Sequence, residues 1–489
     1  MSKVFNPMLL CDFYKLSHKA QYPEGTELVY STWTPRESRI DGVKKVVVFG
    51  LQHFIKEYLI EYFNQNFFKR PKLEIVVDYK RVLKYTLGID NAPTKHIEDL
   101  HDLGYLPLKI KALPEGSVVP LRVPTMTIHN TDKRFFWLTN YIETLASCEL
   151  WQPSTSATIA KEYRHILDGY ALETVGDVGF VPFQGHDFSM RGMSTLHSSI
   201  TSGMGHLLSF YGTDTIPAIQ GLEKFYNANI EKEMVGTSIS ATEHSVQCCY
   251  GDDLTYIKRM ITEVYPSGFV SIVSDGYDFW KVITEVIPAL KDEILKRDGK
   301  VVIRPDSGDP EKILCGDPKS EISHVRKGAV ECLYEISGGT VTEKGYKVLD
   351  GHIGLIYGDA ITLKRADSIS ANLKEKGFAS INTVYGIGSF TYQFNTRDTF
   401  GYALKSTLAV INGKEIQIFK DPRTDTDRIK KSQRCRVAVL KDERDGFRFV
   451  DGLSLDDTIK GDCLVEVFNN GKLLVDEKLC DIRERLKNA

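Results

Sequence analysis

The chain has 489 residues, which exceeds what one hydrophobic core usually serves, so we expect at least two domains. Hydrophobic residues make up 42% and charged residues 26%, a composition that excludes a disordered or fibrous chain. The formal net charge of −3 gives no electrostatic footprint for nucleic acid or a membrane surface, so we expect neither as a partner. No uninterrupted apolar run approaches the roughly 20 residues of a membrane-spanning helix.

The cysteines and the first residues predict a cytoplasmic protein. Nine cysteines are scattered without a C-x-x-C spacing, which indicates reduced thiols rather than a disulfide framework. The stretch from Met1 to Pro23 has too short an apolar run for a signal peptide and no small-residue cleavage site.

Residues 1–150 are expected to form an N-terminal mixed α/β domain. Apolar residues at helical spacing predict helices over residues 6–18 and 51–63. Strand-like patterns occur at residues 27–34, 46–49, 108–112 and 126–129.

Residues 151–398 alternate predicted strands with predicted helices. Long helices are expected over residues 157–174 and 194–210. Short apolar runs then predict strands at residues 270–273, 301–303, 354–356 and 382–385, separated by helices at 277–296, 321–336 and 360–376. This alternation predicts a parallel sheet, either open or closed into a barrel.

Residues 399–489 predict antiparallel strands. Asn412-Gly413 and Asn470-Gly471 each lie between strand-like runs, which is a hairpin signal. We expect a β-rich segment that packs on the N-terminal domain.

Polar residues follow the predicted parallel strands, where ligands bind in such folds. Arg304 suits a phosphate or diphosphate, and Asp306 suits sugar hydroxyls or hydrated Mg²⁺. The alternative is an ordinary strand-ending turn with an Arg–Asp pair, and this stretch alone leaves the two readings even. Gly358-Asp359-Ala360 is expected to open a helix toward a phosphate, and Gly386 to Gly388 offers a second cradle.

His244 is a candidate for proton or phosphoryl transfer. Beside Glu243, its imidazole suits a general base or a nucleophile toward a phosphoryl group. The alternative is a histidine that merely begins a helix, capped by Ser240 or Thr242. No pair of histidines has metal-ligand spacing with a third partner, so a tightly held transition metal is not expected.

Several motifs occur in one order along nearly the whole chain. They are Asp12 to His18, His186-Asp187-Phe188 with Arg191-Gly192, Gly212-Thr213-Asp214, Glu243-His244-Ser245, Ser274 to Asp278, Ile303 to Gly308, and Gly358-Asp359. Together they resemble the nicotinamide phosphoribosyltransferase family of type II phosphoribosyltransferases. Two positions depart from the family pattern: Ser389-Phe390 follows Gly388 instead of further glycines, and Ser189-Met190 replaces Gly-Tyr.

The resemblance implies a fold and a reaction. The fold is an irregular parallel α/β barrel with a second mixed α+β domain built from the N- and C-terminal segments. The reaction converts nicotinamide and phosphoribosyl diphosphate into nicotinamide mononucleotide and diphosphate in NAD salvage. It uses Mg²⁺ and is stimulated by ATP through a phosphohistidine. The implied assembly is a homodimer with shared active sites.

The resemblance also implies roles for individual residues. His244 is the phosphorylated histidine, activated by Glu243 or Asp275. Phe188 and the second subunit's Tyr14 enclose the nicotinamide ring. Asp214 accepts its carboxamide NH₂ and repels nicotinate, with Arg191 near the ring. Ribose and phosphate binding is implied for Arg304, Asp306, Gly358, Asp359, Gly388, Ser389, Arg36, Arg397, Lys405 and Lys420. Mg²⁺ is expected to bind through the diphosphate, with Asp306 and Asp275 contributing through water.

Three other functions fit part of the sequence. A nicotinate phosphoribosyltransferase shares the fold and the chemistry, but Asp214 opposes it. A sugar-phosphate isomerase or lyase on a barrel explains the phosphate turns but not the set of Tyr14, Phe188 and Asp214. A signalling role outside cells is opposed by the lack of an export signal.

Overall fold

The computed structural model describes residues 4–358, 360–420 and 432–489. It divides into two compact units. The terminal unit comprises residues 1–158, 222–228 and 395–489, and the barrel unit comprises residues 159–221 and 229–394. The predicted domain limits at residues 150 and 398 fall near these boundaries. The short segment 222–228 was not predicted to separate from its neighbours.

The barrel unit is built on one seven-stranded sheet in the order β7-β6-β14-β13-β10-β9-β8, with every pair parallel. The strands are β6 (Gly185–Asp187), β7 (Gly212–Thr213), β8 (Ser240–Ala241), β9 (Val270–Val273), β10 (Val301–Arg304), β13 (Ile353–Tyr357) and β14 (Thr383–Ile387). A parallel bridge between Gly212 and Thr237 joins edge strand β7 to the segment that leads into β8. The predicted irregular parallel barrel is therefore confirmed.

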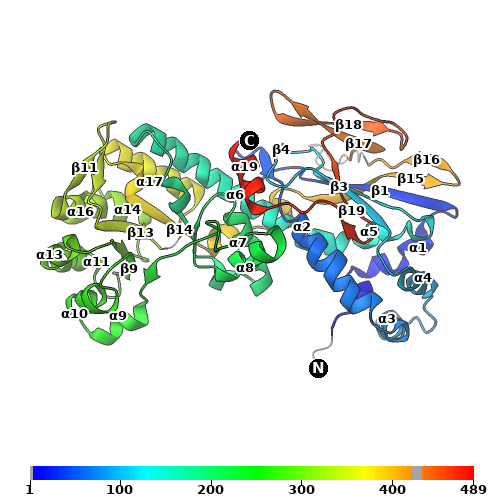
Figure 1. The fold of residues 1–489 in the computed structure, drawn as a ribbon, viewed down its shortest axis with the longest axis horizontal. Coiled ribbons are helices and arrows are strands. Elements are labelled where there is room, and N and C mark those ends of the chain that lie inside the picture. The colour runs from blue at the N-terminus through cyan, green and yellow to red at the C-terminus, as the bar shows by residue number, and fades with distance from the viewer. Residues whose placement is uncertain (1–3, 359, 421–431) are drawn as a thin grey trace. The chain divides into compact units, whose positions relative to one another are not determined.

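Helices cover the outer face of these strands. Helix α16 (Ala329–Ser337) contacts β13, and Figure 1 shows it grouped around that strand with α14 (Pro310–Cys315) and α17 (Leu363–Glu375). The other helices of this unit include α7 (Leu196–His206), the start of α8 (Ile216–Tyr226), α9 (His244–Tyr250), α10 (Asp253–Arg259), α11 (Phe279–Lys281), α12 (Ile287–Ala289), α13 (Lys291–Leu295) and α18 (Ser389–Tyr392).

One predicted helix of the barrel unit is broken for a clear steric reason. Residues 321–336 form α15 (Ser323–Lys327) and α16, separated by Gly328. Gly328 has φ +84°, and a Cβ there would lie 2.3 Å from the Gly316 nitrogen. The glycine therefore permits a close backbone approach that a continuous helix would not allow.

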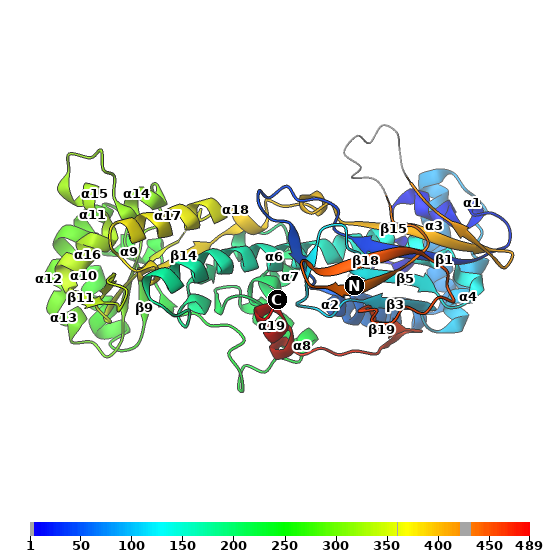
Figure 2. The same ribbon diagram turned by 90° about the horizontal axis from the view of Figure 1, so that it is seen from above.

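The terminal unit contains a second seven-stranded sheet, which is antiparallel and combines both ends of the chain. Its order is β16 (Lys414–Gln417), β15 (Ala403–Ile411), β1 (Thr26–Thr34), β5 (Met126–Asn130), β3 (Leu108–Ala112), β19 (Val465–Asn469) and β20 (Lys472–Leu473). Figure 2 shows β1, β5 and β15 side by side. The second domain built from the N- and C-terminal segments is thus confirmed.

Both predicted Asn-Gly hairpins form in this sheet. Asn412 and Gly413 have φ 49° and 70° and connect β15 to β16. Asn470 and Gly471 have φ 48° and 78° and connect β19 to β20. Two consecutive residues with positive φ match the right-handed twist of the flanking strands, which is why asparagine followed by glycine specifies this turn.

Smaller elements complete the terminal unit. Its helices are α1 (His18–Gln21), α2 (Leu51–Phe54), α3 (Lys72–Leu87), α4 (Lys95–Leu103), α5 (Leu138–Tyr141), the start of α6 (Glu143–Thr174), and α19 (Leu479–Lys487). Short strand pairs are β2 (Lys45–Val47) with β4 (Val118–Pro120), and β17 (Arg436–Asp442) with β18 (Gly446–Leu453). The helix predicted over residues 6–18 was wrong: this stretch contains the 3₁₀ turns Pro7–Leu9 and Phe13–Ser17.

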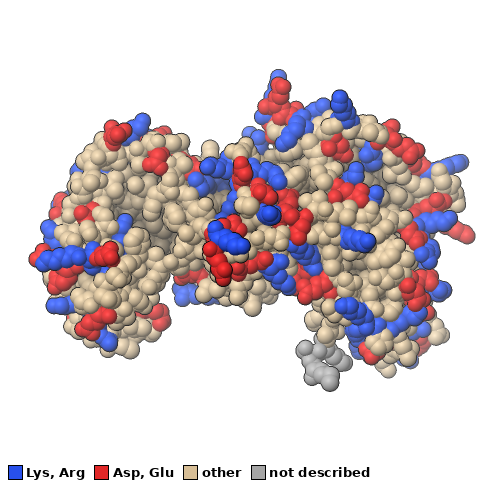
Figure 3. All heavy atoms as spheres, viewed as in Figure 1, with Lys and Arg blue, Asp and Glu red and all other residues tan. Residues whose placement is uncertain are grey.

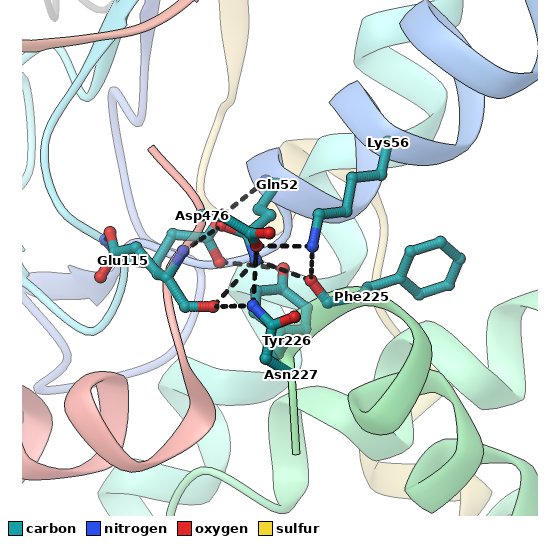
Figure 4. A network of polar contacts seen from close by, with 8 residues as sticks. Gln52, Lys56, Glu115, Phe225, Tyr226, Asn227 and Asp476 are labelled. Atoms are coloured by element: carbon teal, nitrogen blue, oxygen red, sulfur yellow. Dashed lines mark hydrogen bonds and ion pairs between the residues drawn. The ribbon is translucent and has the colours of Figure 1, made fainter. Parts of the chain in front are cut away.

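A polar network fixes the C-terminal segment and residues 222–228 within the terminal unit (Figure 4). Gln52 Nε2 donates to the carbonyls of Phe225 and Glu477 over 2.6 and 3.0 Å. The buried carboxylate of Glu115 accepts hydrogen bonds from the Gln52 N–H and the Tyr226 hydroxyl. Burial raises the pKa of Glu115 to about 7, although these donors oppose the shift.

The surface carries both signs of charge. Figure 3 shows lysine and arginine interspersed with aspartate and glutamate on the face in view, in keeping with the formal net charge of −3. Among the described helices, none is long and apolar enough to cross a membrane.

Candidate active site

The strand ends of the barrel unit bring most of the predicted site residues of that unit to one edge of the sheet. Asp275 follows β9, Arg304 ends β10, and Gly358 follows β13. Because all the strands are parallel, their carboxyl ends share this edge, as the sequence predicted.

A chain of hydrogen bonds links His244, Asp275 and Asp306. Asp275 Oδ1 lies 2.9 Å from His244 Nε2, and Asp275 Oδ2 accepts from the Asp306 N–H over 2.9 Å. Burial alone would raise the pKa of Asp275, but hydrogen bonds from Ser307, His244 and the Asp306 N–H hold it below its usual value. Asp275 is therefore an ionised partner that fixes the His244 ring.

Glu243 has a different contact. Its carboxylate accepts a hydrogen bond from the Ser245 hydroxyl over 2.6 Å, and its backbone is the N-cap of α9. His244 does begin a helix, but no side chain caps that helix end, so Ser240 and Thr242 do not have the capping role considered above. Of the two predicted activating carboxylates, the geometry favours Asp275.

Arg304 ends β10 and contacts Thr242, the residue that follows β8. Its Nη2 donates to the Thr242 carbonyl over 2.5 Å, and its Nε lies 3.7 Å from Asp306 Oδ1. Its side chain is only 12% exposed. The strand-ending Arg–Asp pair therefore exists, and its Arg304 lines a cavity rather than an open surface.

The absence of a side chain at Gly358 makes room for the Asp306 carboxylate. A Cβ on Gly358 would lie 1.8 Å from Asp306 Oδ1, so only glycine lets this carboxylate lie against the backbone. The prediction that Gly358-Asp359-Ala360 opens a helix was wrong. Ala360 has φ +59°, and α17 begins at Leu363 with Thr362 as its N-cap. Asp359 itself lies outside the described residues.

The second predicted phosphate turn lies against the turn that carries Arg191. Gly388 is the N-cap of α18, and Ser389 is its first residue. A Cβ on Gly192 would lie 2.0 Å from Ser389 Oγ, so the two turns are in close contact. Arg191 is exposed and is not among the residues that line the cavity.

A cavity of about 530 Å³ lies along the sheet of the barrel unit. Its polar lining includes Arg304, Asp214, His186 and Ser238, and Phe188 contributes an aromatic face. The His186 and Phe188 rings are 4.5 Å apart. Most of the remaining lining is apolar, which suits a flat, weakly polar ring.

Asp214 is held by two side chains that sequence reasoning did not assign. His186 Nε2 and Ser238 Oγ lie 2.9 and 2.7 Å from the same oxygen, Asp214 Oδ1. Burial opposes ionisation of Asp214, but the hydrogen bonds from His186 and Ser238 bring its pKa below the usual value. The only sequence signal was the place of His186 in the motif with Phe188.

The remaining predicted residues gather in the terminal unit. Burial lowers the pKa of Lys405, Glu143 opposes the shift, and the charges of three neighbours lower it further. These neighbours are Arg36, Lys420 and Arg397. Arg397 also acts electrostatically on Tyr14, a residue that is 56% exposed. The predicted site therefore consists of two groups, one in each unit.

Comparison with known proteins identifies the family of the chain. The sequence model of the nicotinate phosphoribosyltransferase (NAPRTase) family matches residues 183–472, and that of the nicotinamide phosphoribosyltransferase N-terminal domain matches residues 6–110. The nicotinamide phosphoribosyltransferase of Acinetobacter baylyi is 51% identical over 99% of this chain and 98% of its own.

The chain belongs to the nicotinamide phosphoribosyltransferase family. The member from Mycoplasma pneumoniae is 34% identical over 86% of this chain and 92% of its own. Among solved structures, a nicotinate-nucleotide pyrophosphorylase from Pyrococcus furiosus has a TM-score of 0.58 at 14% identity, covering 100% of this chain and 96% of its own. Human nicotinic acid phosphoribosyltransferase has a TM-score of 0.52 at 13% identity, covering 98% and 93%. These two structures support the fold.

Family membership makes the chain a phosphoribosyltransferase and excludes the isomerase or lyase reading. Within the described ranges, no group of three or more His, Cys, Asp or Glu side chains could hold a metal ion.

Proposed function

We propose that the chain is a nicotinamide phosphoribosyltransferase of NAD salvage, which forms nicotinamide mononucleotide and diphosphate from nicotinamide and phosphoribosyl diphosphate. The main support is that Phe188, an ionised Asp214 and Arg304 line the same cavity. An aromatic face, a carboxamide acceptor and a phosphate-binding cation are the groups that the two substrates need.

The proposed transfer requires diphosphate to depart from a ribose carbon that becomes cation-like. Arg304 would stabilise the charge that develops on the leaving diphosphate, and Asp306 would orient the ribose hydroxyls. Phe188 would hold the pyridine nitrogen in line with that carbon, which reduces the entropy lost in reaching the transition state.

Mg²⁺ fits this arrangement as a diphosphate-bound ion. The Asp275 carboxylate is engaged by His244 and the Asp306 N–H, so direct coordination by it would break existing hydrogen bonds. Asp306 and Asp275 would instead contact the hydration shell. When bound, the ion would neutralise part of the diphosphate charge.

ATP stimulation is proposed to pass through His244. An ionised Asp275 can only accept a hydrogen bond, so His244 donates from Nε2, and in the neutral ring Nδ1 then has the free lone pair. Nδ1 would attack the γ-phosphorus of ATP, a P–N bond would form, and the bond to the β-phosphate oxygen would break to release ADP. Asp275 would stabilise the positive charge that develops on the ring.

A homodimer with shared sites would unite the two groups of residues. The exposed Tyr14 ring would cover the nicotinamide held by Phe188 of the other subunit, and Arg397 and Lys405 would add phosphate contacts. Mixing two inactive variants tests this directly. Tyr14→Ala and Arg304→Ala chains, unfolded and refolded together, are expected to recover about a quarter of wild-type activity, because mixed dimers contain one intact site. Recovery no greater than the sum of the separate variants would rule out shared sites.

The compartment is proposed to be the cytoplasm. All nine cysteines are free thiols, and four of them are exposed, a state that a reducing compartment maintains.

A competition assay tests which pyridine base the enzyme prefers. With equal nicotinamide and nicotinate in one reaction, we expect the nicotinamide product to exceed the nicotinate product by at least about tenfold, because an ionised Asp214 accepts an amide N–H and repels a carboxylate. Asp214→Asn removes the charge and is expected to reduce the ratio. A wild-type preference for nicotinate would assign the chain to the sister activity instead.

A further inference from the structure

We propose that His186 is a positioning residue for base choice: it holds Asp214 in one orientation, with one oxygen bound by the protein and the other presented to the carboxamide of the substrate. This inference rests on the proposed function and deepens it, because Asp214 alone does not explain how its carboxylate is kept in place.

The hydrogen bonds to Asp214 are unequally divided between its two oxygens. His186 Nε2 and Ser238 Oγ both contact Oδ1, over 2.9 and 2.7 Å. An ionised carboxylate has no proton to donate, so His186 must donate from Nε2. Asp214 lines the cavity with its side chain 44% exposed, and the oxygen left for a ligand there is Oδ2.

The backbone fixes the His186 ring in this position. His186 on β6 pairs with Gly212 on β7, two residues before Asp214. A Cβ on Gly212 would lie 2.8 Å from His186 Nδ1, so the missing side chain makes room for the imidazole. The Asp214 N–H also donates to the Asp187 carbonyl over 2.9 Å, which ties the acceptor to the same strand as His186.

The same ring supports the other half of the base pocket. The His186 and Phe188 ring centroids are 4.5 Å apart at an interplanar angle of 39°. One imidazole therefore contacts the Phe188 ring and donates to the amide acceptor, so a single side chain touches both recognition elements.

Loss of the His186 hydrogen bond would change which base is accepted. Burial favours the neutral form of Asp214, and the donors His186 and Ser238 oppose it. A neutral carboxyl group has an O–H that can donate to the carboxylate of nicotinate, whereas the ionised form repels that carboxylate. His186 thus makes Asp214 selective for an amide.

Two substitutions at this position separate hydrogen bonding from packing. His186→Gln keeps an N–H donor near the place of Nε2, and His186→Leu keeps bulk without a donor. For His186→Leu we expect the KM for nicotinamide and the relative kcat/KM for nicotinate each to rise about tenfold, the effect of losing a hydrogen bond to a charged group. The KM for phosphoribosyl diphosphate should change by less than about twofold, and His186→Gln should recover most of the selectivity.

Equal loss of selectivity in both variants would overturn the inference. A parallel rise in the KM for nicotinamide and the KM for phosphoribosyl diphosphate would also overturn it, because either result indicates general damage to the site. If His186→Leu does not fold, Ser238→Ala replaces it as the test, because Ser238 is the other donor to Asp214 Oδ1. We expect a smaller rise in the relative kcat/KM for nicotinate in that variant. An unchanged ratio would contradict the role of the hydrogen bonds to Oδ1. A wild-type enzyme that does not use nicotinamide would refute the proposed function itself, and this inference with it.

Discussion

Arg304→Ala is expected to lower kcat/KM for phosphoribosyl diphosphate by about a thousandfold, the upper range for removal of one transition-state donor. Arg304 is the cation of the barrel unit that combines burial, a place at the strand ends and contact with the cavity. Its Nη2 hydrogen bond to Thr242 holds the guanidinium in a fixed orientation, so little order is lost when a diphosphate binds.

Arg304→Lys is the matched control for charge. Lysine keeps one positive charge but lacks the planar fork that binds two phosphate oxygens at once, so we expect an intermediate loss of about tenfold to a hundredfold. Steady-state kinetics with varied phosphoribosyl diphosphate, together with thermal unfolding of each variant, measure the effect. Near wild-type values in the alanine variant would show that the diphosphate binds elsewhere.

His244→Ala is expected to abolish the stimulation by ATP while basal transfer from phosphoribosyl diphosphate continues. The imidazole is the proposed phosphoryl acceptor, and the proposed transfer step assigns it no role. Label from the γ-phosphate of ATP should appear on the wild-type chain and be absent from this variant. The exposed His165 provides a matched control, since His165→Ala should label and respond to ATP like the wild type.

Variants of Asp275 and Glu243 test which carboxylate assists the phosphorylation of His244. Asp275→Asn should label more slowly, because the amide does not stabilise the charge that develops on the ring. Glu243→Gln should label normally, since the Glu243 carboxylate bonds to Ser245. Full ATP stimulation of His244→Ala would contradict the phosphohistidine.

The fold could be predicted wherever short-range signals agree with the tertiary structure. The runs at residues 270–273 and 108–112 form β9 and β3 with the predicted bounds. The first is rich in β-branched residues, and the second alternates apolar residues with lysine, so both match a strand. Helix limits were less predictable. The interruption at Gly328 depends on the backbone of residues 314–316, and no periodicity within the helix reports a contact so distant in sequence.

The site could be predicted from the strand ends but not from the contacts that orient it. Asp275, Arg304 and Asp306 follow strands whose pairing puts them at one edge. The bonds of His186 and Ser238 to Asp214 join three segments, and their existence depends on the pairing of β6 with β7 and on the missing side chain of Gly212. Sequence placed His186 in a motif, and only the structure shows its donor role.

The most direct test of the central claim is formation of nicotinamide mononucleotide by the purified chain. Nicotinamide, phosphoribosyl diphosphate and Mg²⁺ are incubated with and without ATP, and the mononucleotide and diphosphate are quantified separately. We predict equal molar amounts of the two products and a faster rate with ATP. Diphosphate released without the mononucleotide, or product formed only when nicotinate replaces nicotinamide, would contradict the proposed function.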